Sequence, residues 1–305
     1  MTTAVHSPPR GLSHSRGILL VLLAGVFWSS IGLVIRLMDG ADAWQILFYR
    51  SLSLTIFLFA VLAIRAGGWP TRVFREAGAT GVLGGIALVA AFAGSIMSIL
   101  GTTVANAMFL FASAPFFAAV LGWALLGERV RGATWVAIAV AAGGILLMVA
   151  EAISFGQLWG NAAAVMSALG FAFFTIALRR GHTTDMLPVV CYGGLFTTAL
   201  AAVVCLTTGD GLAVTGRDAS LALALGVVQL GTGLSIYTIG SRVVPAAELA
   251  LLAMTEVVLG PFWVWLFLGE TAGIYTLAGG AILLCAIAGN ALSGLRRRPP
   301  PAGVH

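Results

Sequence analysis

The stretch TVANAMFLFASAPFFAAVLGWALL, residues 103–126, indicates the class of this protein. It holds no charged side chain, and Gly127-Glu128-Arg129 follow it directly. An α-helix rises 1.5 Å per residue, so about 20 apolar residues cross the hydrocarbon core of a bilayer. The stretch therefore predicts a membrane-spanning helix.

Similar apolar runs lie on both sides of this one. We predict ten spans, at 17–37, 43–64, 77–99, 103–126, 132–150, 157–178, 186–207, 218–240, 244–268 and 273–293. The composition agrees, because 60% of the residues are apolar and 9% are charged, against about 25% charged in soluble domains. It excludes a soluble enzyme and a nucleic-acid binder, despite a pI of about 9.7. A transmembrane β-barrel would alternate apolar and polar residues, so we predict an all-α membrane protein.

The arginines indicate how the chain is oriented. All 16 basic residues are arginine. If the N-terminus is cytoplasmic, thirteen of them fall on the cytoplasmic side, Arg36 and Arg217 fall outside, and Arg50 lies within a span. Positive charge is retained on the inner side of membranes. We therefore expect cytoplasmic tails at 1–16 and 294–305, with an even number of spans between them.

The chain also repeats itself. RLMDGADAWQILFY, residues 36–49, matches RRGHTTDMLPVVCY, residues 179–192, with Arg, Asp and Tyr shared 143 positions apart. LGWALLGE, residues 121–128, matches WVWLFLGE, residues 263–270, at an offset of 142. We predict two five-helix repeats, 17–150 and 157–293, around a central cavity. Because five is odd, the second repeat enters the membrane inverted, as in many secondary transporters with a midplane site.

These features resemble a known family. One predicted helix runs from Asn106 through Pro115 into LLGER, its counterpart carries Glu256 and ends in LGE, and Arg50 follows Tyr49 early in the second span. Over essentially the whole chain this resembles the EamA-type branch of the drug/metabolite transporter superfamily. The size and composition are similar to those of bacterial aromatic amino-acid exporters of the YddG type. The family usually has Glu-Pro where this chain has Glu256-Val257.

The resemblance implies a helical basket that opens alternately to each side of the membrane. It also implies a multi-pass protein of the bacterial cytoplasmic (inner) membrane that exports small metabolites. We expect no cofactor, and we expect a monomer, with a dimer left open.

Charges inside spans are costly, about 3 kcal/mol each on insertion scales, so they point to a site. Arg50 lies about 12 Å deep from the outer side, and Glu256 about 18 Å deep from the inner side, at 1.5 Å per residue. We expect the two to form an ion pair or to hold a zwitterionic substrate between them, and each could instead be a structural charge. Glu248 is a candidate gate, or a residue that stabilises a helix N-terminus.

Uncharged polar and aromatic residues within the spans are candidates for the cavity lining. With Glu256, the predicted substrate-binding residues are Trp28, Ser95, Asn106, Phe109, Asn161, Phe171, Gln229 and Tyr237. Such a lining suits an aromatic or neutral amino acid, and it suits a hydrophobic drug equally well.

We therefore expect an exporter of small amphipathic metabolites, foremost amino acids. A proton-coupled multidrug exporter with Glu256 as proton carrier is the alternative. A channel is disfavoured because no filter-like run is present. A membrane-embedded enzyme is disfavoured because His182 and Asp185 are the only candidate pair, so no catalytic residue is assigned. Cys191, Cys205 and Cys285 lack metal-site spacing, and no glycine-rich stretch has the Lys-Ser/Thr of a nucleotide loop.

Overall fold

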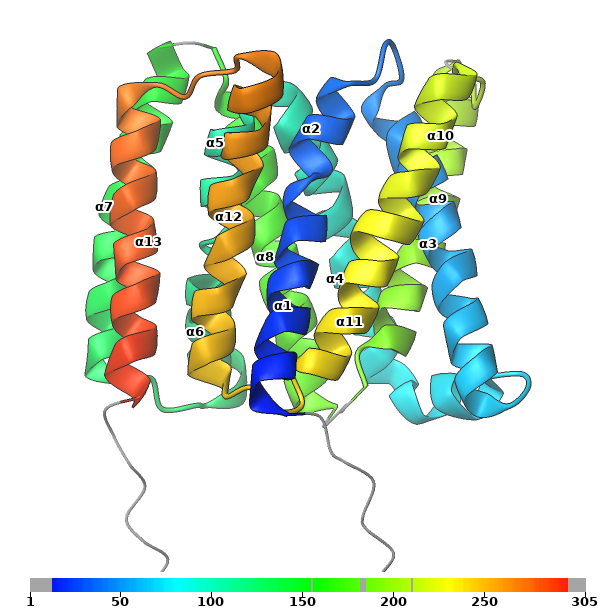
Figure 1. Ribbon diagram of the computed structural model, residues 1–305, viewed down its shortest axis with the longest axis horizontal. Coiled ribbons are helices and arrows are strands. Elements are labelled where there is room, and N and C mark those ends of the chain that lie inside the picture. Colours follow the sequence, from blue (N-terminus) through cyan, green and yellow to red (C-terminus); the bar gives the residue numbers. More distant parts are fainter. Residues whose placement is uncertain (1–12, 155, 182–184, 210, 296–305) are drawn as a thin grey trace, which may run out of the picture.

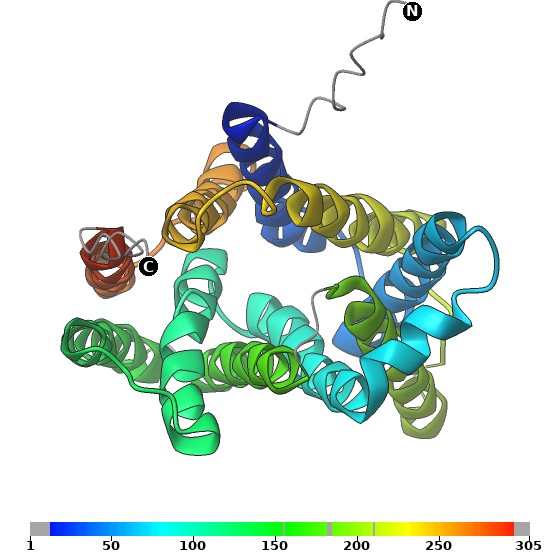
Figure 2. The ribbon, with the colours of Figure 1, turned by 90° about the horizontal axis from the view of Figure 1, so that it is seen from below.

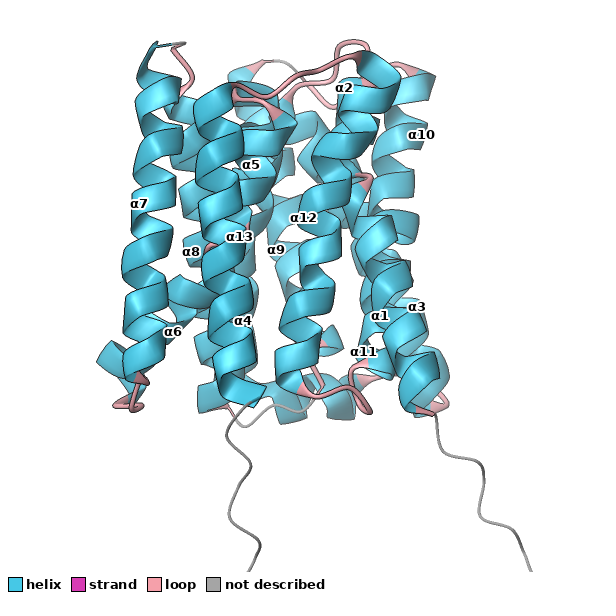
Figure 3. Ribbon diagram, turned by 60° about the vertical axis from the view of Figure 1, so that its left-hand side comes forward, coloured by secondary structure: helices cyan, strands magenta, loops and turns pink. Residues whose placement is uncertain are grey.

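The computed structural model describes residues 13–154, 156–181, 185–209 and 211–295. This part of the chain is helical throughout apart from its connections (Figure 3). It contains ten segments long and apolar enough to cross a membrane, which confirms the ten predicted spans. The predicted tails lie mostly outside the described residues, as does His182.

The spans are built from fourteen helical elements, because some spans are broken. The elements are α1 (His14–Ser29), α2 (Ile31–Arg36), α3 (Ala43–Ala66), α4 (Thr71–Gly101), α5 (Val104–Phe111), α6 (Ala114–Leu126), α7 (Gly132–Ser154), α8 (Leu158–Arg180), α9 (Leu187–Thr208), α10 (Gly216–Ala224), the π-helix η1 (Leu225–Thr232), α11 (Gly233–Gly240), α12 (Ala246–Leu268) and α13 (Ile274–Leu295).

The helices stand side by side, and α1 begins at the same end of the bundle at which α13 ends (Figure 1). Helix α4 packs on α8, α3 on α9, α7 on α13, and α1 on both α11 and α12. Seen from below (Figure 2), α1, α12 and the α10–η1–α11 span lie on one side, and α4, α6 and α8 lie on the other. Each half of the sequence therefore packs mainly against the other half.

Glycines end several helices, as the LLGER and LGE motifs predict. Gly127 follows α6 at φ 67° and Gly269 follows α12 at φ 68°. This left-handed conformation carries little penalty for glycine, and it is the common way to stop a helix. The two sequence motifs therefore place Glu128 and Glu270 just beyond matching helix ends.

Four spans depart from the single regular helices that we predicted. The first span breaks at Ser30, between α1 and α2. Helix α4 begins six residues before the predicted start at 77, because a short helical segment precedes a bend at Gly78, φ 56°. The fourth span breaks between α5 and α6 ahead of Pro115, which lacks the N–H that a continuous helix needs. The eighth span widens into η1 at its centre, where Gly226 lies against the Arg50 carbonyl of α3.

Glycines also let helices from different halves approach closely. A Cβ atom on Gly144 of α7 would lie 2.6 Å from the carbonyl oxygen of Gly279 on α13. A Cβ on Gly85 of α4 would lie 2.7 Å from Cβ of Tyr192 on α9. Small residues at such crossings are typical of membrane helices, and here they bring helices together within one chain.

Candidate functional site

Arg50 projects from α3 into the bundle and is 3% exposed. Its guanidinium carbon lies 5.2 Å from the ring centroid of Phe92 on α4. Nε and Nη1 are buried, and neither has a hydrogen-bond partner within the described part of the chain. A buried guanidinium normally pairs with a carboxylate or carbonyl oxygen. Nε and Nη1 of Arg50 therefore remain available to bind an anionic group.

Glu256 lies near the middle of α12 and is partly buried. At 100° per residue its side chain leaves α12 opposite the exposed Val258 and Trp265. Gly25 of α1 packs against Thr255 and the Glu256 backbone. Among the described residues, no ion pair within 4.0 Å joins Arg50 to Glu256. The direct ion pair that we considered is therefore not formed in this structure.

Trp28, Gln229 and Tyr237 come together around the π-helix. The rings of Trp28 and Tyr237 have centroids 5.2 Å apart. Gln229 Nε2 donates to the Trp28 carbonyl oxygen at 3.3 Å. Trp28 Nε1 and Gln229 Oε1 are buried and unbonded within the described residues. The cluster thus combines two aromatic faces with a free donor and a free acceptor, and π-helical turns are frequent at functional sites.

Asn106 of α5 and Asn161 of α8 form a second polar cluster, and each is 2% exposed. Asn106 Nδ2 donates to Asn161 Oδ1 and, at 2.9 Å, to Thr102 Oγ1, which in turn donates to Gln157 Oε1 at 3.0 Å. Asn106 Oδ1 and Asn161 Nδ2 have no partner among the residues described. This cluster also offers a donor and an acceptor to a polar ligand.

The other three predicted binding residues make separate contacts. Ser95 donates to the Phe92 carbonyl oxygen of its own helix at 2.8 Å. Phe109 is 7% exposed and packs against Gly280 of α13. Phe171 is 50% exposed and leaves α8 on the side opposite Met166 and Phe173. Phe171 is thus the most exposed of Ser95, Phe109 and Phe171.

Glu248 lies in the first turn of α12. Its Oε2 is 2.9 Å from Nε2 of His14, at the start of α1. Both side chains are partly exposed. The contact joins the first and ninth spans at the end of the bundle that we predict to be cytoplasmic.

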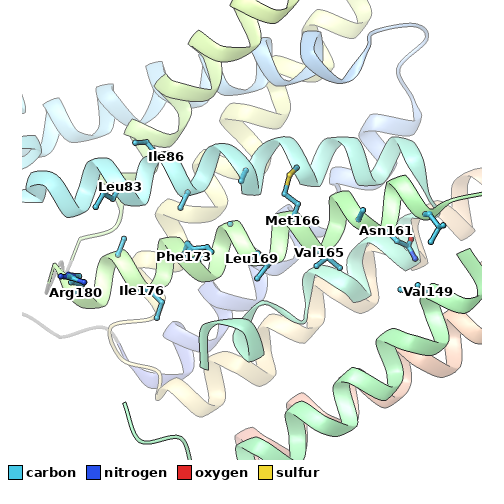
Figure 4. Close-up of a pocket in the computed structure, with 16 residues that line it drawn as sticks. Leu83, Ile86, Val149, Asn161, Val165, Met166, Leu169, Phe173, Ile176 and Arg180 are labelled. Carbon is cyan, nitrogen blue, oxygen red and sulfur yellow. The ribbon is translucent and has the colours of Figure 1, made fainter. Parts of the chain in front are cut away.

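A groove of about 930 Å³ lies between α4 and α8, with Val149 of α7 at its edge. Asn161 lies near one end of its row of α8 residues and Arg180 near the other (Figure 4). The other lining residues are almost all apolar, and Leu83 and Phe173 are exposed. We interpret this groove as a lipid-facing surface, because its lining contains neither Arg50 nor Glu256.

Some polar residues were not among the predicted site residues. The hydroxyls of Ser51 and Ser98 are buried and lack a partner in the described part of the chain. Glu151 of α7 accepts from the N–H and hydroxyl of Thr276, at 2.7 and 2.6 Å, and so caps α13. Arg36 pairs with Glu270 at 2.8 Å. The sequence repeats contain Arg36 and Glu270 without predicting that they pair, and Ser98 belongs to the polar residues within spans, whereas no sequence signal marks Ser51 or Glu151.

The residues described contain no group of three or more His, Cys, Asp or Glu that could hold a metal ion. Asp185, paired with His182 in the sequence-based enzyme alternative, instead caps α9 by accepting from the Leu187 N–H at 3.0 Å. It also lies 3.8 Å from Arg65. These contacts explain Asp185 as a structural residue.

The fold and these buried polar residues define a polytopic α-helical membrane protein of ten spans. A family model, that of the EamA-like transporter family, matches the chain twice, at residues 15–150 and 154–292. The chain belongs to this family, and it is a transporter. The resemblance inferred from the sequence is confirmed at this level.

Individual relatives agree with the family assignment. A pseudopaline exporter, CntI, of Pseudomonas aeruginosa is 26% identical over 281 residues, covering 88% of this chain and 94% of that protein. An uncharacterized transporter of Archaeoglobus fulgidus is 26% identical over 275 residues, covering 88% and 93%. One crystal structure superposes with a TM-score of 0.61 at 20% identity, covering 95% of this chain and 100% of that one. That last likeness concerns the fold alone.

Proposed function

We propose that this transporter exports small zwitterionic metabolites, foremost aromatic or neutral amino acids, by alternating access. The observation that carries the proposal is a pair of opposite charges inside the bundle, Arg50 and Glu256, that do not bond to each other. An α-amino acid supplies a carboxylate for the guanidinium and an ammonium for the carboxylate. Each charge-assisted hydrogen bond gained is worth about 1.5–3 kcal/mol.

The remaining proposed binding residues suit the rest of such a molecule. Trp28 and Tyr237 offer aromatic faces, and Gln229 Oε1 offers a free acceptor beside them. An aromatic side chain stacked there would gain about 0.5–1.5 kcal/mol beyond its burial. This favours an amphipathic substrate with a flat apolar part, and Phe171 supplies a further partly open ring.

The alternating mechanism rests on two inverted halves. Three observations support them: the family model matches twice, Asp42 and Asp185 both cap helices 143 positions apart, and Gly127 and Gly269 end helices identically. We place both termini in the cytoplasm and the protein in the bacterial inner membrane, because most arginines gather at the end where α1 starts. Export is favoured because a relative is named an exporter.

The test is counterflow in proteoliposomes that contain the purified protein. Vesicles preloaded with unlabelled amino acid should accumulate the labelled form transiently and saturably. The matching amine, which lacks the carboxylate, and the matching amide, which lacks its charge, should compete at least tenfold more weakly. Equal competition by all three compounds would contradict the proposed role of Arg50, and flux that does not saturate would indicate a channel.

A second candidate is a proton-coupled multidrug exporter, which is favoured by the mid-span carboxylate of Glu256, because this carboxylate forms no ion pair with a described residue. The same vesicles distinguish it from a facilitator. An imposed pH gradient should drive accumulation of a hydrophobic cation only if a proton is exchanged. Pseudopaline is a useful additional probe, because a relative carries its name.

A further inference from the structure

Two ion pairs join the halves of the chain, one at each end of the bundle. Arg36, at the end of α2, pairs with Glu270, just beyond α12, through Nε and Oε2 at 2.8 Å. Arg179, at the end of α8, pairs with Glu128, just beyond α6, through Nη1 and Oε2 at 2.8 Å. In each pair the arginine comes from one half and the glutamate from the other.

The two ion pairs are formed by residues at equivalent positions of the two halves of the sequence. Arg36 and Arg179 are the arginines of the first sequence repeat, 143 positions apart, and Glu128 and Glu270 end the second repeat, 142 positions apart. Each glutamate follows a glycine in the same left-handed conformation. An operation that exchanged the halves would therefore exchange the two ion pairs and the two ends of the bundle.

The pairs nevertheless differ in how completely they are bonded. At the outer end, Arg36 Nη2 also donates to the Thr102 carbonyl oxygen at 2.7 Å. Glu270 Oε1 also accepts from the Val104 N–H, at the start of α5, at 2.7 Å. The side chains of Arg36 and Glu270 are 26% and 20% exposed.

At the inner end the bonding is sparser. In the described part of the chain, Glu128 has Arg179 as its hydrogen-bond partner through a single bond. The side chains of Arg179 and Glu128 are 46% and 41% exposed. The outer ion pair thus has additional hydrogen bonds and is less exposed, whereas the inner ion pair has a single hydrogen bond and is more exposed.

We propose that the pairs Arg36–Glu270 and Arg179–Glu128 are reciprocal gates, and that this structure has the outer gate closed and the inner gate loosened. The inference rests on the alternating access proposed above. The two ion pairs are built alike, so the hydrogen bonds lost when one gate opens are regained when the other closes. The inward-open and outward-open states therefore stay close in free energy. A carrier that cycles needs such a balance. The four side chains are positioning residues, since they set which side is open without touching substrate.

Thiol labelling tests this without using a substrate. In a background with the three native cysteines replaced, Ser95→Cys places a reporter next to Phe92, the ring beneath Arg50. A membrane-impermeant thiol reagent is added to right-side-out vesicles, and separately to inside-out vesicles. Glu270→Gln should raise the labelling rate from outside about tenfold, the factor expected for loss of one charge-assisted hydrogen bond, and lower it from inside. Glu128→Gln should do the opposite.

The controls separate gating from general loosening. Glu76→Gln breaks an ion pair with Arg72 that lies wholly within α4, and it should change neither rate. The exchanged pair Arg36→Glu with Glu270→Arg should return labelling towards the starting rate. Equal effects of both glutamine variants on outside labelling, or no labelling from either side in any variant, would overturn the inference. Opposite effects in a protein that shows no amino-acid counterflow would leave the gates standing and refute the proposed substrate.

Discussion

Replacing Arg50 with methionine separates a binding role from a structural one. Arg50→Met keeps a long apolar side chain and removes only the guanidinium. Since Nε and Nη1 bond to no described residue, the substitution leaves no carboxylate stranded. We expect the variant to fold and to lose affinity for amino acids.

The magnitudes follow from the surroundings of the guanidinium. Insertion of a charge into a bilayer costs about 3 kcal/mol, and the stacking on Phe92 at 5.2 Å recovers about 0.5–2 kcal/mol. Removing the charge should therefore raise the free energy of unfolding by about 1–2.5 kcal/mol. Losing a charge-assisted bond to the substrate carboxylate costs about 1.5–3 kcal/mol, which is a tenfold to roughly 150-fold increase in the dissociation constant.

The assay compares an amino acid with its carboxamide in counterflow, alongside the thermal unfolding midpoint in detergent. Arg50→Met should weaken the binding of the amino acid by the stated factor and should weaken the binding of the carboxamide by much less. Arg50→Lys should fall between the two, because it keeps a charge but not the two-pronged geometry. An equal loss for both ligands, or a midpoint that drops by many degrees, would refute the reasoning and make Arg50 a structural charge.

Three further predictions concern other parts of the molecule. Glu256→Gln should weaken the binding of the amino acid about tenfold but should not change the binding of the acid that lacks the amino group. If transport instead lost its dependence on a pH gradient, proton exchange at Glu256 would be favoured. Gly226→Ala should destabilise the protein by about 1–3 kcal/mol, because the new Cβ would overlap Ser53 Oγ and the Arg50 carbonyl oxygen of α3. Gly143→Ala is the control and should be neutral or stabilising, because nothing lies within 4 Å of its Cβ position. Equal thermal unfolding midpoints for the two variants would contradict this. Asp218→Asn should destabilise by about 1–3 kcal/mol, since Asp218 accepts the N–H groups of residues 39–41 at 2.9–3.1 Å; a thermal midpoint equal to that of the unaltered protein would show that water replaces these bonds.

The candidate site was predictable from sequence where a charged or otherwise polar residue interrupts an apolar span. Arg50 and Glu256 stand out because charged residues inside apolar spans are rare and costly. Ser51 and Ser98 stand out less, because a helical serine usually bonds to its own backbone, as Ser95 does. That their hydroxyls lack described partners depends on which helices pack against them.

The ten spans and the ends of many helices follow from local stretches of the sequence. A bilayer offers no water to backbone groups, so each apolar run has to close its own hydrogen bonds as a helix, and glycine motifs such as those at Gly127 and Gly269 stop the helix locally. Which charged side chains meet follows instead from the packing of the helices. Arg36 bonds to Glu270 across the chain while Arg50 and Glu256 stay apart, because side-chain partners depend on helix rotation, on the widened turn of η1 and on close glycine contacts, none of which is encoded in local hydropathy.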